Sequence, residues 1–324
     1  MYNGGTSYTG KYDKYNNHGP KILISARGAA GYVNFVEGKY WAGNSCYSVD
    51  ITNDKYNIKY LFQYIKVNQH LFTDYQQTAN IPSVSKKDVE RFVIKAPKLH
   101  EQTKLGFFFT KIDSLIALHQ RKLDHLEEQK KGFLQKMFPK KGQTVPEIRF
   151  PGFTDAWEQR KLGEVAEIKT GSRNHQDSVD NGKYPFFVRS EKVERLNEYD
   201  FDTKAILVPG DGRIGEIFHY YDGKFALHQR VYKVDNFKEA NPLYLLNLFK
   251  YKFKKHALRL NAQGTVPSLR LPMFTNWNIL IPNLNEQQKI GLFFQQLDSL
   301  IALHQRKLNH LELLKKSLLQ QMFI

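Results

Sequence analysis

The sequence predicts an α+β fold: two globular domains with small β-sheets and helices, separated by two long antiparallel coiled-coil helices, with a pseudo-twofold internal repeat. Three observations lead to this prediction. Residues 97–138 recur as residues 282–323, and 28 of the 42 positions are identical. Each copy has the hydrophobic spacing of one long helix. Each copy also follows a more variable stretch of short strand-like runs separated by turn residues.

The two repeated stretches are predicted to form a coiled coil. Their apolar residues step by four and three over about four heptads, which is the spacing of a coiled-coil seam. Pro97 and Pro282 precede the helices, as expected for a residue that cannot continue a helix. Two near-identical seams in one chain most economically pack on each other. The predicted seam residues are Ile112, Ile116, Leu123, Leu126, Leu297, Ile301, Leu308 and Leu311.

Polar residues interrupt each seam at matching positions, His119 and Lys130 in the first copy and His304 and Lys315 in the second. One interpretation is that they reach out to solvent from a partly wet seam. The other is that they fix the register of the pair, at a cost in stability. A metal site built on His119 and His304 needs at least one further ligand, and the nearest histidines face another side of the helix. We therefore predict no metal site.

The repeat divides the chain into five segments. Residues 1–96 form a first domain, 97–138 the first repeated helix, 139–155 a linker, 156–281 a second domain and 282–324 the second repeated helix. The linker is rich in Pro, Gly and Lys, which places it on the surface.

The second domain repeats the plan of the first less closely than the helices repeat each other. Val266-Pro267-Ser268, for example, matches Ile81-Pro82-Ser83. About thirty residues that open the second domain have no counterpart in the first domain, by the same alignment of the two halves. We therefore expect the first domain to be N-terminally incomplete, and either completed by another chain or only marginally folded.

Within the first domain, Lys21–Ser25 is a predicted strand and Ile58–Phe72 a predicted aromatic-rich helix. Tyr32–Val36 and Lys39–Trp41 flank Glu37-Gly38, a pattern that predicts a hairpin. In the second domain, Asn241-Pro242 has the signature of a helix start.

Composition narrows the class of protein. The net charge is +16, which favours a polyanion partner, most often nucleic acid. No run of about 18 apolar residues occurs, so we expect no membrane span. The N-terminus lacks the apolar core of a signal peptide. Cys46 is the only cysteine, which excludes internal disulfides and favours the cytoplasm as the default compartment.

Catalytic motifs are weak. Gly210–Gly215 fits the dinucleotide pattern G-x-G-x-x-G, but the residues after Gly215 alternate around an Asp-Gly turn instead of opening a helix, so we interpret the pattern as a tight strand-to-strand loop. Asp155, Glu167 and Lys169 superficially suggest a nuclease set. We instead expect Glu167 and Lys169 on the solvent face of a strand whose buried face holds Ile168. The sequence therefore predicts no catalytic residue.

Nucleic-acid binding has better support. The helix from Pro242 carries Lys250, Lys252, Lys254, Lys255, His256 and Arg259. These are either a solvated helix face or phosphate contacts. Arg, Asn and Gln in predicted loops can make bidentate contacts to base edges. The candidate DNA-binding residues are Arg27, Lys39, Arg173, Asn174, His175, Arg189, Arg213, Gln229, Arg230, Lys254, Lys255, Gln263 and Thr265.

The alternation of variable domains with near-identical helices resembles the specificity (S) subunit of a type I restriction–modification system, over essentially the whole chain. The residues on which this resemblance rests are Leu162-Gly163-Glu164, Glu167-Ile-Lys169-x-Gly171, Val266-Pro267-Ser268 and the Pro-x-Leu-x-Glu-Gln helix starts at 97–102 and 282–287.

This resemblance implies that each variable domain is a target recognition domain that reads one half of a bipartite site on double-stranded DNA. It implies that the helices form a spacer on which two methyltransferase (M) subunits dock, and that restriction–translocase (R) subunits join them. The chain itself would hold no cofactor, with S-adenosylmethionine, ATP and Mg²⁺ bound only by its partners. The alternative is a coiled-coil scaffold whose basic domains bind nucleic acid or another polyanion without sequence specificity.

Overall fold

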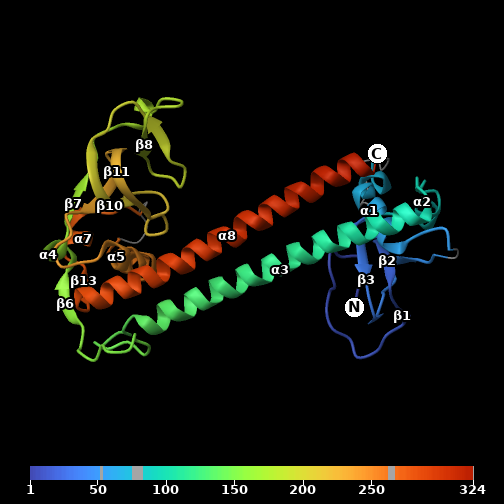
Figure 1. The fold of residues 1–324 in the computed structure, drawn as a ribbon, viewed down its shortest axis with the longest axis horizontal. Coiled ribbons are helices and arrows are strands. Elements are labelled where there is room, and N and C mark those ends of the chain that lie inside the picture. Colours follow the sequence, from blue (N-terminus) through green and yellow to red (C-terminus); the bar gives the residue numbers. More distant parts are fainter. Residues whose placement is uncertain (52–53, 75–82, 262–266, 324) are drawn as a thin grey trace. The chain divides into compact units, whose positions relative to one another are not determined.

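The computed structural model describes residues 1–51, 54–74, 83–261 and 267–323. The chain divides into two compact units. Unit 1 comprises Met1–Leu123 with His304–Ile324, and unit 2 comprises Asp124–Leu303. Two long helices, α3 (Leu99–Met137) and α8 (Leu284–Met322), each contribute one part to either unit (Figure 1). Each unit therefore consists of a globular domain and one segment of each long helix.

The globular part of unit 2 is built on a six-stranded sheet in the order β7-β12-β10-β11-β8-β9. Its central strands are the longest, and all neighbours are antiparallel except the β11–β8 pair. The strands are β7 (Glu167–Thr170), β8 (Tyr184–Phe187), β9 (Glu194–Leu196), β10 (Phe201–Pro209), β11 (His219–Leu227) and β12 (Val231–Asp235). Ile206 and Val234 are fully buried beneath helices of the same unit, in the largest hydrophobic core of the described residues.

Short elements complete unit 2. Strand β6 (Glu158–Lys161) pairs with β13 (Asn278–Ile281), and the turn of helix α4 (Leu162–Val165) packs on α7 (Leu271–Thr275). Helix α5 (Pro242–Leu248) continues through a π-helical turn, η3 (Phe249–Phe253), into α6 (Lys254–Leu260). Short 3-10 turn η2 (His175–Asp177) lies between β7 and β8. As predicted, α5 starts at Asn241-Pro242, and the Asn241 side chain accepts from the backbone N–H groups of Leu243 and Tyr244.

Unit 1 has a smaller sheet in the order β3-β2-β5 and a two-stranded pair β1-β4. Its elements are β1 (Asn17–His18), β2 (Lys21–Ser25), β3 (Val33–Val36), β4 (Lys39–Tyr40), β5 (Cys46–Val49), α1 (Ile58–Val67), the 3-10 turn η1 (Gln69–Phe72) and α2 (Lys86–Glu90). The predicted strand at Lys21–Ser25 is confirmed as β2, whose Ile22, Leu23 and Ile24 are fully buried.

Two predictions for unit 1 need correction. The predicted helix Ile58–Phe72 is interrupted, because α1 ends at Val67 and η1 follows. The prediction of a hairpin around Glu37-Gly38 is wrong, because the two flanking strands do not pair with each other. Strand β3 pairs with β2, and β4 pairs with β1, so each strand finds a partner from an earlier part of the chain. Gly38 has φ +74°, which turns the chain without pairing the flanking strands.

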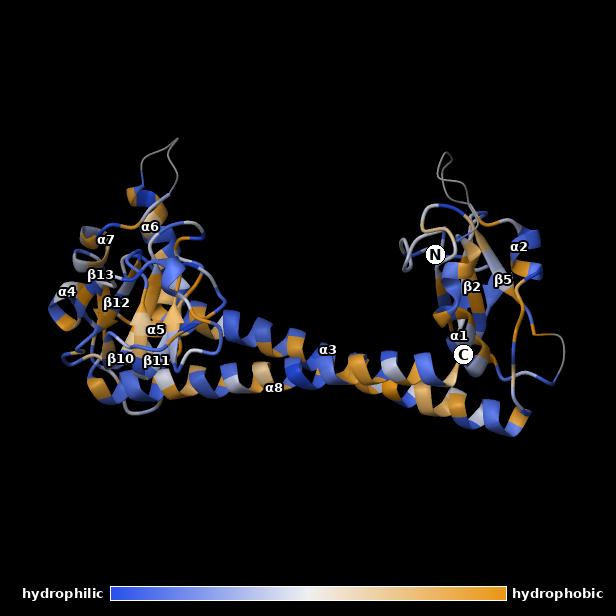
Figure 2. Cartoon of the chain, turned by 90° about the horizontal axis from the view of Figure 1, so that it is seen from above, coloured by the Kyte–Doolittle hydropathy of each residue, from blue (hydrophilic) through white to orange (hydrophobic). Residues whose placement is uncertain are grey.

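Within each unit, the two helix segments run antiparallel. In unit 1, Lys315 Nζ lies 2.5 Å from the carboxylate of Asp113. In unit 2, Lys130 Nζ lies 2.5 Å from the carboxylate of Asp298. Lys130 and Lys315 are equivalent in the repeat, as are Asp113 and Asp298, so the two ion pairs are copies of one another. Figure 2 shows hydrophilic and hydrophobic bands alternating along both helices.

The joint between globular domain and long helix is also repeated. Gln102 on α3 accepts from the backbone N–H of Asn57 at 2.9 Å, and Gln287 on α8 accepts from that of Asn241 at 2.8 Å. Both glutamine amides also donate to the carbonyl of the proline before the helix, at 2.8 Å. A Cβ atom at Gly106 or Gly291 would lie only 2.9–3.0 Å from the backbone nitrogen of Tyr60 or Tyr244. Glycine at these helix positions therefore lets each domain approach its helix closely.

These observations confirm the predicted fold class: mixed α and β domains with small sheets, long helices and an internal repeat. The finer division of the chain at residues 96, 138, 155 and 281 stays a prediction. Among the residues that the structure describes, no helix has the length and apolar character needed to cross a bilayer.

Candidate DNA interface

The loop between β10 and β11, residues 210–218, organises the candidate interface of unit 2. It joins two antiparallel strands, in agreement with the interpretation of the G-x-G-x-x-G pattern as a strand-to-strand loop. Gly212 and Gly215 have φ values of +74° and +65°. A Cβ at Gly215 would lie 2.6 Å from the Cα of Lys254, so this glycine allows the loop to press against the start of α6. The loop and α6 therefore present their side chains together.

Asp211 in this loop holds two arginines. Its carboxylate accepts from Arg189 at 3.2 Å and lies 3.9 Å from the guanidinium of Arg230. The Asp211 side chain is only 18% exposed, whereas those of Arg189 and Arg230 are 51% and 63% exposed. The carboxylate thus lies beneath the guanidinium groups, which project outward. Each guanidinium carries five N–H donors, so a single acidic partner leaves most of them available to a ligand.

Glu216 forms a second support. It accepts from Arg213 at 2.9 Å and from Lys254 at 2.6 Å. Hydrogen bonds from Lys254 and Arg213 lower the pKa of the Glu216 carboxyl, which keeps it charged. Arg213 also donates to Glu191 at 3.1 Å. Such exposed pairs are worth little to stability, and they leave the remaining N–H donors of Arg213 and Lys254 available to a phosphate or a base edge.

A third set of candidate residues lies around the buried ring of His228. Its Nδ1 accepts from the backbone N–H of Arg230 at 2.9 Å. Burial, followed by the positive charge of Arg189, lowers the pKa of the His228 imidazole, and His175 and Arg230 add to this effect. His228 is therefore neutral at physiological pH. Backbone hydrogen bonds join the candidate residues on different connections: Arg173 bonds to Leu227 and Gln229, and the His228 N–H donates to Phe187 at 3.0 Å. The β7–β8, β8–β9 and β11–β12 connections therefore lie close together.

Comparison with known proteins identifies the family. The sequence model described as the type I restriction modification DNA specificity domain matches residues 1–128 and 154–313, most of the chain. The chain belongs to the family of type I restriction–modification specificity subunits.

Individual relatives agree with this assignment. The EcoDI specificity subunit of Escherichia coli is 30% identical over 150 residues, which are 45% of this chain and 31% of that protein. The MjaVIII specificity subunit of Methanocaldococcus jannaschii is 25% identical over 80% of this chain and 68% of its own length. The crystal structure of a type I restriction–modification S subunit from M. genitalium superposes with a TM-score of 0.80 at 17% identity, covering all of this chain and 88% of the other. This last similarity concerns the fold.

The predicted DNA-binding residues of this specificity subunit differ in how exposed their side chains are and in how far other residues of the domain already bind them. Arg173 donates to Asp200 and to Glu198, both at 2.9 Å, and its side chain is only 28% exposed, whereas that of Arg213 is 62% exposed. Asn174 accepts from Gln229 at 2.6 Å, which ties two candidate residues to each other. His175 and Lys255 are exposed.

The basic helix from Pro242 is less uniform than its sequence indicates. Lys250 pairs with Asp298 at 3.2 Å, and Lys252 donates to the carbonyl of Pro139 at 2.7 Å. Burial lowers the pKa of the Lys252 ammonium. The ring of His256 stacks on Trp277 at 5.5 Å. These three side chains hold the domain together, whereas Lys254 and Lys255 face solvent beside the loop.

In unit 1, the candidates Arg27 and Lys39 are both exposed, and Lys39 lies over the ring of Tyr15 at 4.7 Å. Arg27 falls in the turn that corresponds to the loop of unit 2, at the position of Asp211. Gln263 and Thr265 lie outside the described residues.

The seam candidates divide evenly by burial. Ile112, Leu123, Leu297 and Leu308 are buried, and Ile116, Leu126, Ile301 and Leu311 are half-buried. The polar interruption at His119 and His304 forms a direct contact, with the two Nδ1 atoms 2.9 Å apart. Among the described residues, no group of three or more His, Cys, Asp or Glu side chains is placed to bind a metal.

Sequence reasoning overlooked the acidic residues that position the arginines. Asp211 and Glu216 flank Arg213 in one glycine loop, and this spacing was the available signal. The sequence did not indicate that His228 belongs to the site, because its contact with Arg230 depends on a buried position that only the folded domain creates. The strand expected around Ile168 is confirmed as β7. Its Glu167 and Lys169 form an ion pair at 3.2 Å, while Ile168 is buried.

Proposed function

We propose that this chain is the DNA-reading subunit of a type I restriction–modification complex in the cytoplasm, and that it recognises a bipartite target on double-stranded DNA. The loop face of unit 2, defined here as Arg189, Arg213, Arg230, Lys254 and Lys255, reads one half of the target. The observation that supports this best is the placement of the guanidinium groups above the carboxylates of Asp211 and Glu216.

This arrangement suits sequence reading because it fixes the direction of each guanidinium. A planar guanidinium recognises O6 and N7 of guanine through two parallel hydrogen bonds, a contact worth about 1–3 kcal/mol of discrimination. An arginine held by a carboxylate loses less conformational freedom on binding than a free one. Lys254 and Lys255, as compact charges at the rim, supply phosphate contacts that carry no sequence information.

The internal repeat supports a second reading surface in unit 1. Its turn at Arg27–Gly31 occupies the position of the unit 2 loop, and Arg27 and Lys39 are exposed. The helices α3 and α8 then set the distance between half-sites. Each has 39 residues, which gives a length of about 58 Å at 1.5 Å per residue.

The outer faces of the helices suit the docking of two methyltransferase subunits. The run Asp113–Leu123 recurs unchanged as Asp298–Leu308. Within it, Leu115 and Leu118 in one copy and Leu300 and Leu303 in the other are exposed. Two identical apolar surfaces fit two copies of the same partner. The restriction subunits would join this assembly.

In this assignment the chain is not an enzyme. Adenine methylation with S-adenosylmethionine, and restriction with ATP and Mg²⁺, belong to the M and R subunits. The residues of this chain choose the DNA and position the partners.

Mapping methylated adenines across the genome tests the proposal, in cells that carry this gene and in cells that lack it. The expected result is a set of methylated sites that depends on the gene and shares two short motifs at a fixed separation. The absence of gene-dependent methylation, together with DNA binding that does not discriminate between sequences, would instead indicate a scaffold for a polyanion.

A further inference from the structure

The 210–218 loop of unit 2 leaves the sheet at its first residue. Strand β10 pairs with β11 as far as Leu207 and with β12 as far as Pro209, so regular strand pairing ends before the loop. Gly212 and Gly215 have positive φ values, and glycine gives the loop backbone conformational freedom. The direction in which Asp211 points therefore depends on contacts beyond the regular pairing of the strands.

Leu269 and Ser268 make these contacts. The Gly210 N–H donates to the carbonyl of Arg230 at 2.8 Å, and the Gly210 carbonyl accepts from the N–H of Leu269 at 2.6 Å. The next residue, Asp211, forms an isolated antiparallel bridge with Ser268. The first two residues of the loop are thus held from two sides.

Unit 1 has the same pair of backbone hydrogen bonds. Ala26, which holds the position equivalent to the first loop residue, donates to Ser45 and accepts from Val84, both at 2.8 Å. By the repeat, Ser45 corresponds to Arg230 and Val84 to Leu269, and both Val84 and Leu269 are buried. In both units, the residue just after the recurring Pro-Ser element therefore bonds to the start of the loop.

Two side chains of unit 2 hold Ser268 and Leu269 in turn. Asn261 Oδ1 accepts from the N–H of Ser268 at 3.0 Å, and Asn261 Nδ2 donates to the carbonyl of Ala257 in α6 at 2.9 Å. The hydroxyl of Tyr232 on β12 donates to the carbonyl of Leu269 at 3.2 Å. A helix and a strand are thus both tied to the two residues that contact the loop.

These bonds connect the two kinds of side chain in the loop face. Asp211 lies beneath the arginines of the loop face, and α6 carries its lysines. Helix α6 meets the loop directly at its start, where Lys254 donates to Glu216 at 2.6 Å. At its end it meets the loop again, through Asn261 and Ser268. The arginines are therefore fixed relative to the lysines.

We infer that Asn261 and Tyr232 are positioning residues for sequence reading, because they hold Ser268 and Leu269, which fix Asp211 and the arginines above it. This inference rests on the proposed function. Two parallel hydrogen bonds from an arginine to a guanine depend on the direction of the guanidinium. A lysine on its flexible stem contacts phosphate as a compact charge and tolerates small displacements. Loss of either positioning bond should therefore reduce discrimination between sequences more than it reduces affinity for DNA in general.

The test measures binding of the full chain to a random library of double-stranded DNA, and takes the ratio of affinities between the preferred sequences and the average sequence. Tyr232→Phe removes the hydroxyl, and Asn261→Ala removes the acceptor for Ser268. Each should lower this ratio about tenfold, the equivalent of one hydrogen bond, and leave the salt dependence of binding unchanged. In the absence of DNA, hydrogen exchange at residues 211–216 should become faster in both variants.

Asn261→Asp is the conservative variant. Its carboxylate keeps an oxygen in the place of Oδ1 and can still accept from the N–H of Ser268. It should restore most of the ratio, although its added negative charge weakens binding to all sequences. A ratio as low as that of Asn261→Ala would overturn the role of the bond to Ser268.

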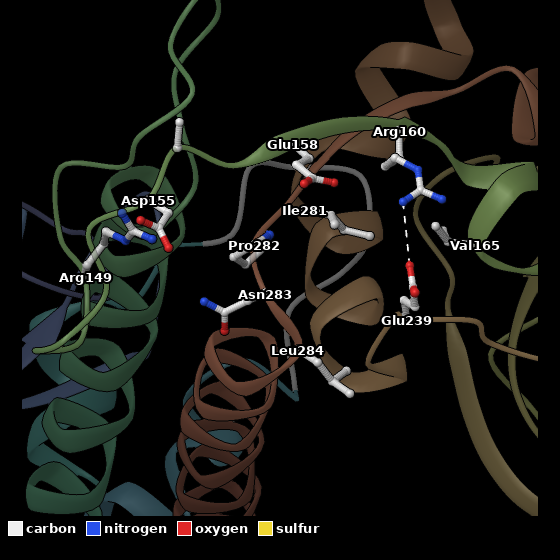
Figure 3. A pocket seen from close by; sticks show the side chains of 11 residues that line it. Arg149, Asp155, Glu158, Arg160, Val165, Glu239, Ile281, Pro282, Asn283 and Leu284 are labelled. Atoms are coloured by element: carbon white, nitrogen blue, oxygen red, sulfur yellow. Dashed lines mark ion pairs between the residues drawn. The ribbon is translucent and has the colours of Figure 1, made fainter.

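The matched control is Tyr244→Phe, which removes a hydroxyl that donates to the carbonyl of Leu280 at 2.5 Å. Leu280 is followed by Ile281, which lines the pocket shown in Figure 3, and no residue that lines this pocket belongs to the loop face. The control loses a hydrogen bond from a tyrosine to a carbonyl, as Tyr232→Phe does, but its ratio should stay unchanged.

The outcomes separate this inference from the proposed function. A wild-type chain that binds all library sequences equally would refute the proposed function, and the inference with it. Where the wild type discriminates, an unchanged ratio in Tyr232→Phe or in Asn261→Ala would overturn the inference for that residue alone. An equal loss in Tyr244→Phe would assign the effect to lowered stability and would also overturn it.

Discussion

The Nδ1 atoms of His119 and His304 lie 2.9 Å apart across the helix pair of unit 1, and the two residues are equivalent in the internal repeat. A hydrogen bond between two ring nitrogens requires that one of them carry a proton and the other a lone pair. The contact is therefore compatible with at most one protonated Nδ1. Lys122 and Lys307 add positive charge to the surroundings of His304.

We expect the stability of this helix pair to fall at acidic pH. Burial, followed by the charge of His119, lowers the pKa of His304 below its ordinary value of 6.5. Between that lowered pKa and 6.5 the unfolded chain binds more protons than the folded chain, so stability is complete above about 6.5 and is lost as pH falls below it. Urea denaturation at a series of pH values measures this. His304→Asn should reduce the loss, with the remainder due to His228 and His256. An unchanged pH dependence in His304→Asn would contradict the assignment.

The buried pair of Arg149 and Glu286 should be costly to break from one side only. Arg149→Met leaves the carboxylate of Glu286 buried without its cation, and the expected loss in the free energy of unfolding is about 3–5 kcal/mol. The double change Arg149→Met with Glu286→Leu should lose less, because it leaves no buried charge. Glu101→Gln, at the exposed equivalent of Glu286, is the matched control and should have almost no effect. Equal losses in the single and double variants would contradict this account.

The loop face of unit 2 should separate affinity from specificity. Replacing Lys254 and Lys255 by Ala should weaken binding to all DNA sequences and reduce the salt dependence by roughly one unit for each phosphate that the variant no longer neutralises. Lys140→Ala with Lys141→Ala is the matched control, since Lys140 also pairs with a glutamate and both residues are exposed. Replacing Arg189 or Arg213 by Ala should change which sequences are preferred. Titrations with a DNA library at several salt concentrations measure both effects, and identical outcomes for the two lysine pairs would remove the phosphate-binding assignment.

The exposed leucines of the repeated helix should control how many methyltransferase subunits bind. Leu115→Asp with Leu118→Asp should remove one M subunit, and Leu300→Asp with Leu303→Asp the other, because the two surfaces are identical. Native mass spectrometry of the reconstituted complex counts the subunits. Leu313→Asp is the control, because Leu313 is exposed but lies outside the identical run. Two bound M subunits in the four-leucine variant would refute this docking site.

The length of the helices should set the separation of the half-sites. Because the segments pair antiparallel, the insertion has to be made in both, with four residues after Leu123 and four after Leu303. Four residues add about 6 Å at 1.5 Å per residue and keep the seam nearly in phase. At ~3.4 Å per base pair the preferred gap should widen by one to two base pairs, with the half-site sequences unchanged. Two-residue insertions rotate the seam by ~200° and should disrupt the pair. Methylation of a library with variable spacing is the readout, and an unchanged gap would refute the spacer role.

The sequence predicted those features that depend on local or repeated patterns. The periodicity of residues 97–138 predicted α3, and Asn241-Pro242 predicted the start of α5. The failures involve partners distant in the chain. The hairpin at Glu37-Gly38 was wrong because β3 and β4 pair with β2 and β1 instead of with each other.

The candidate site obeys the same rule. Its arginines were visible in the sequence, but the bond from Arg173 to Asp200 and that from Lys250 to Asp298 join residues 27 and 48 positions apart. The periodicity of hydrophobic residues along the sequence does not predict contacts between residues so far apart. The residue types of the site are therefore visible in the sequence, and only the fold separates the side chains that face solvent from those that hold the domain together.

The repeated joint at Gln102 and Gln287 has a consequence for how such a chain can change. Each glutamine makes the same bonds to an asparagine-capped helix and to the preceding proline, and each is followed by the glycine that allows close approach. The same set of contacts therefore connects the globular domain to its helix in both units. A globular domain transferred from the start of one long helix to the start of the other would meet the same hydrogen-bond donors and acceptors and the same glycine. One domain could therefore be exchanged for another without changes to the helices.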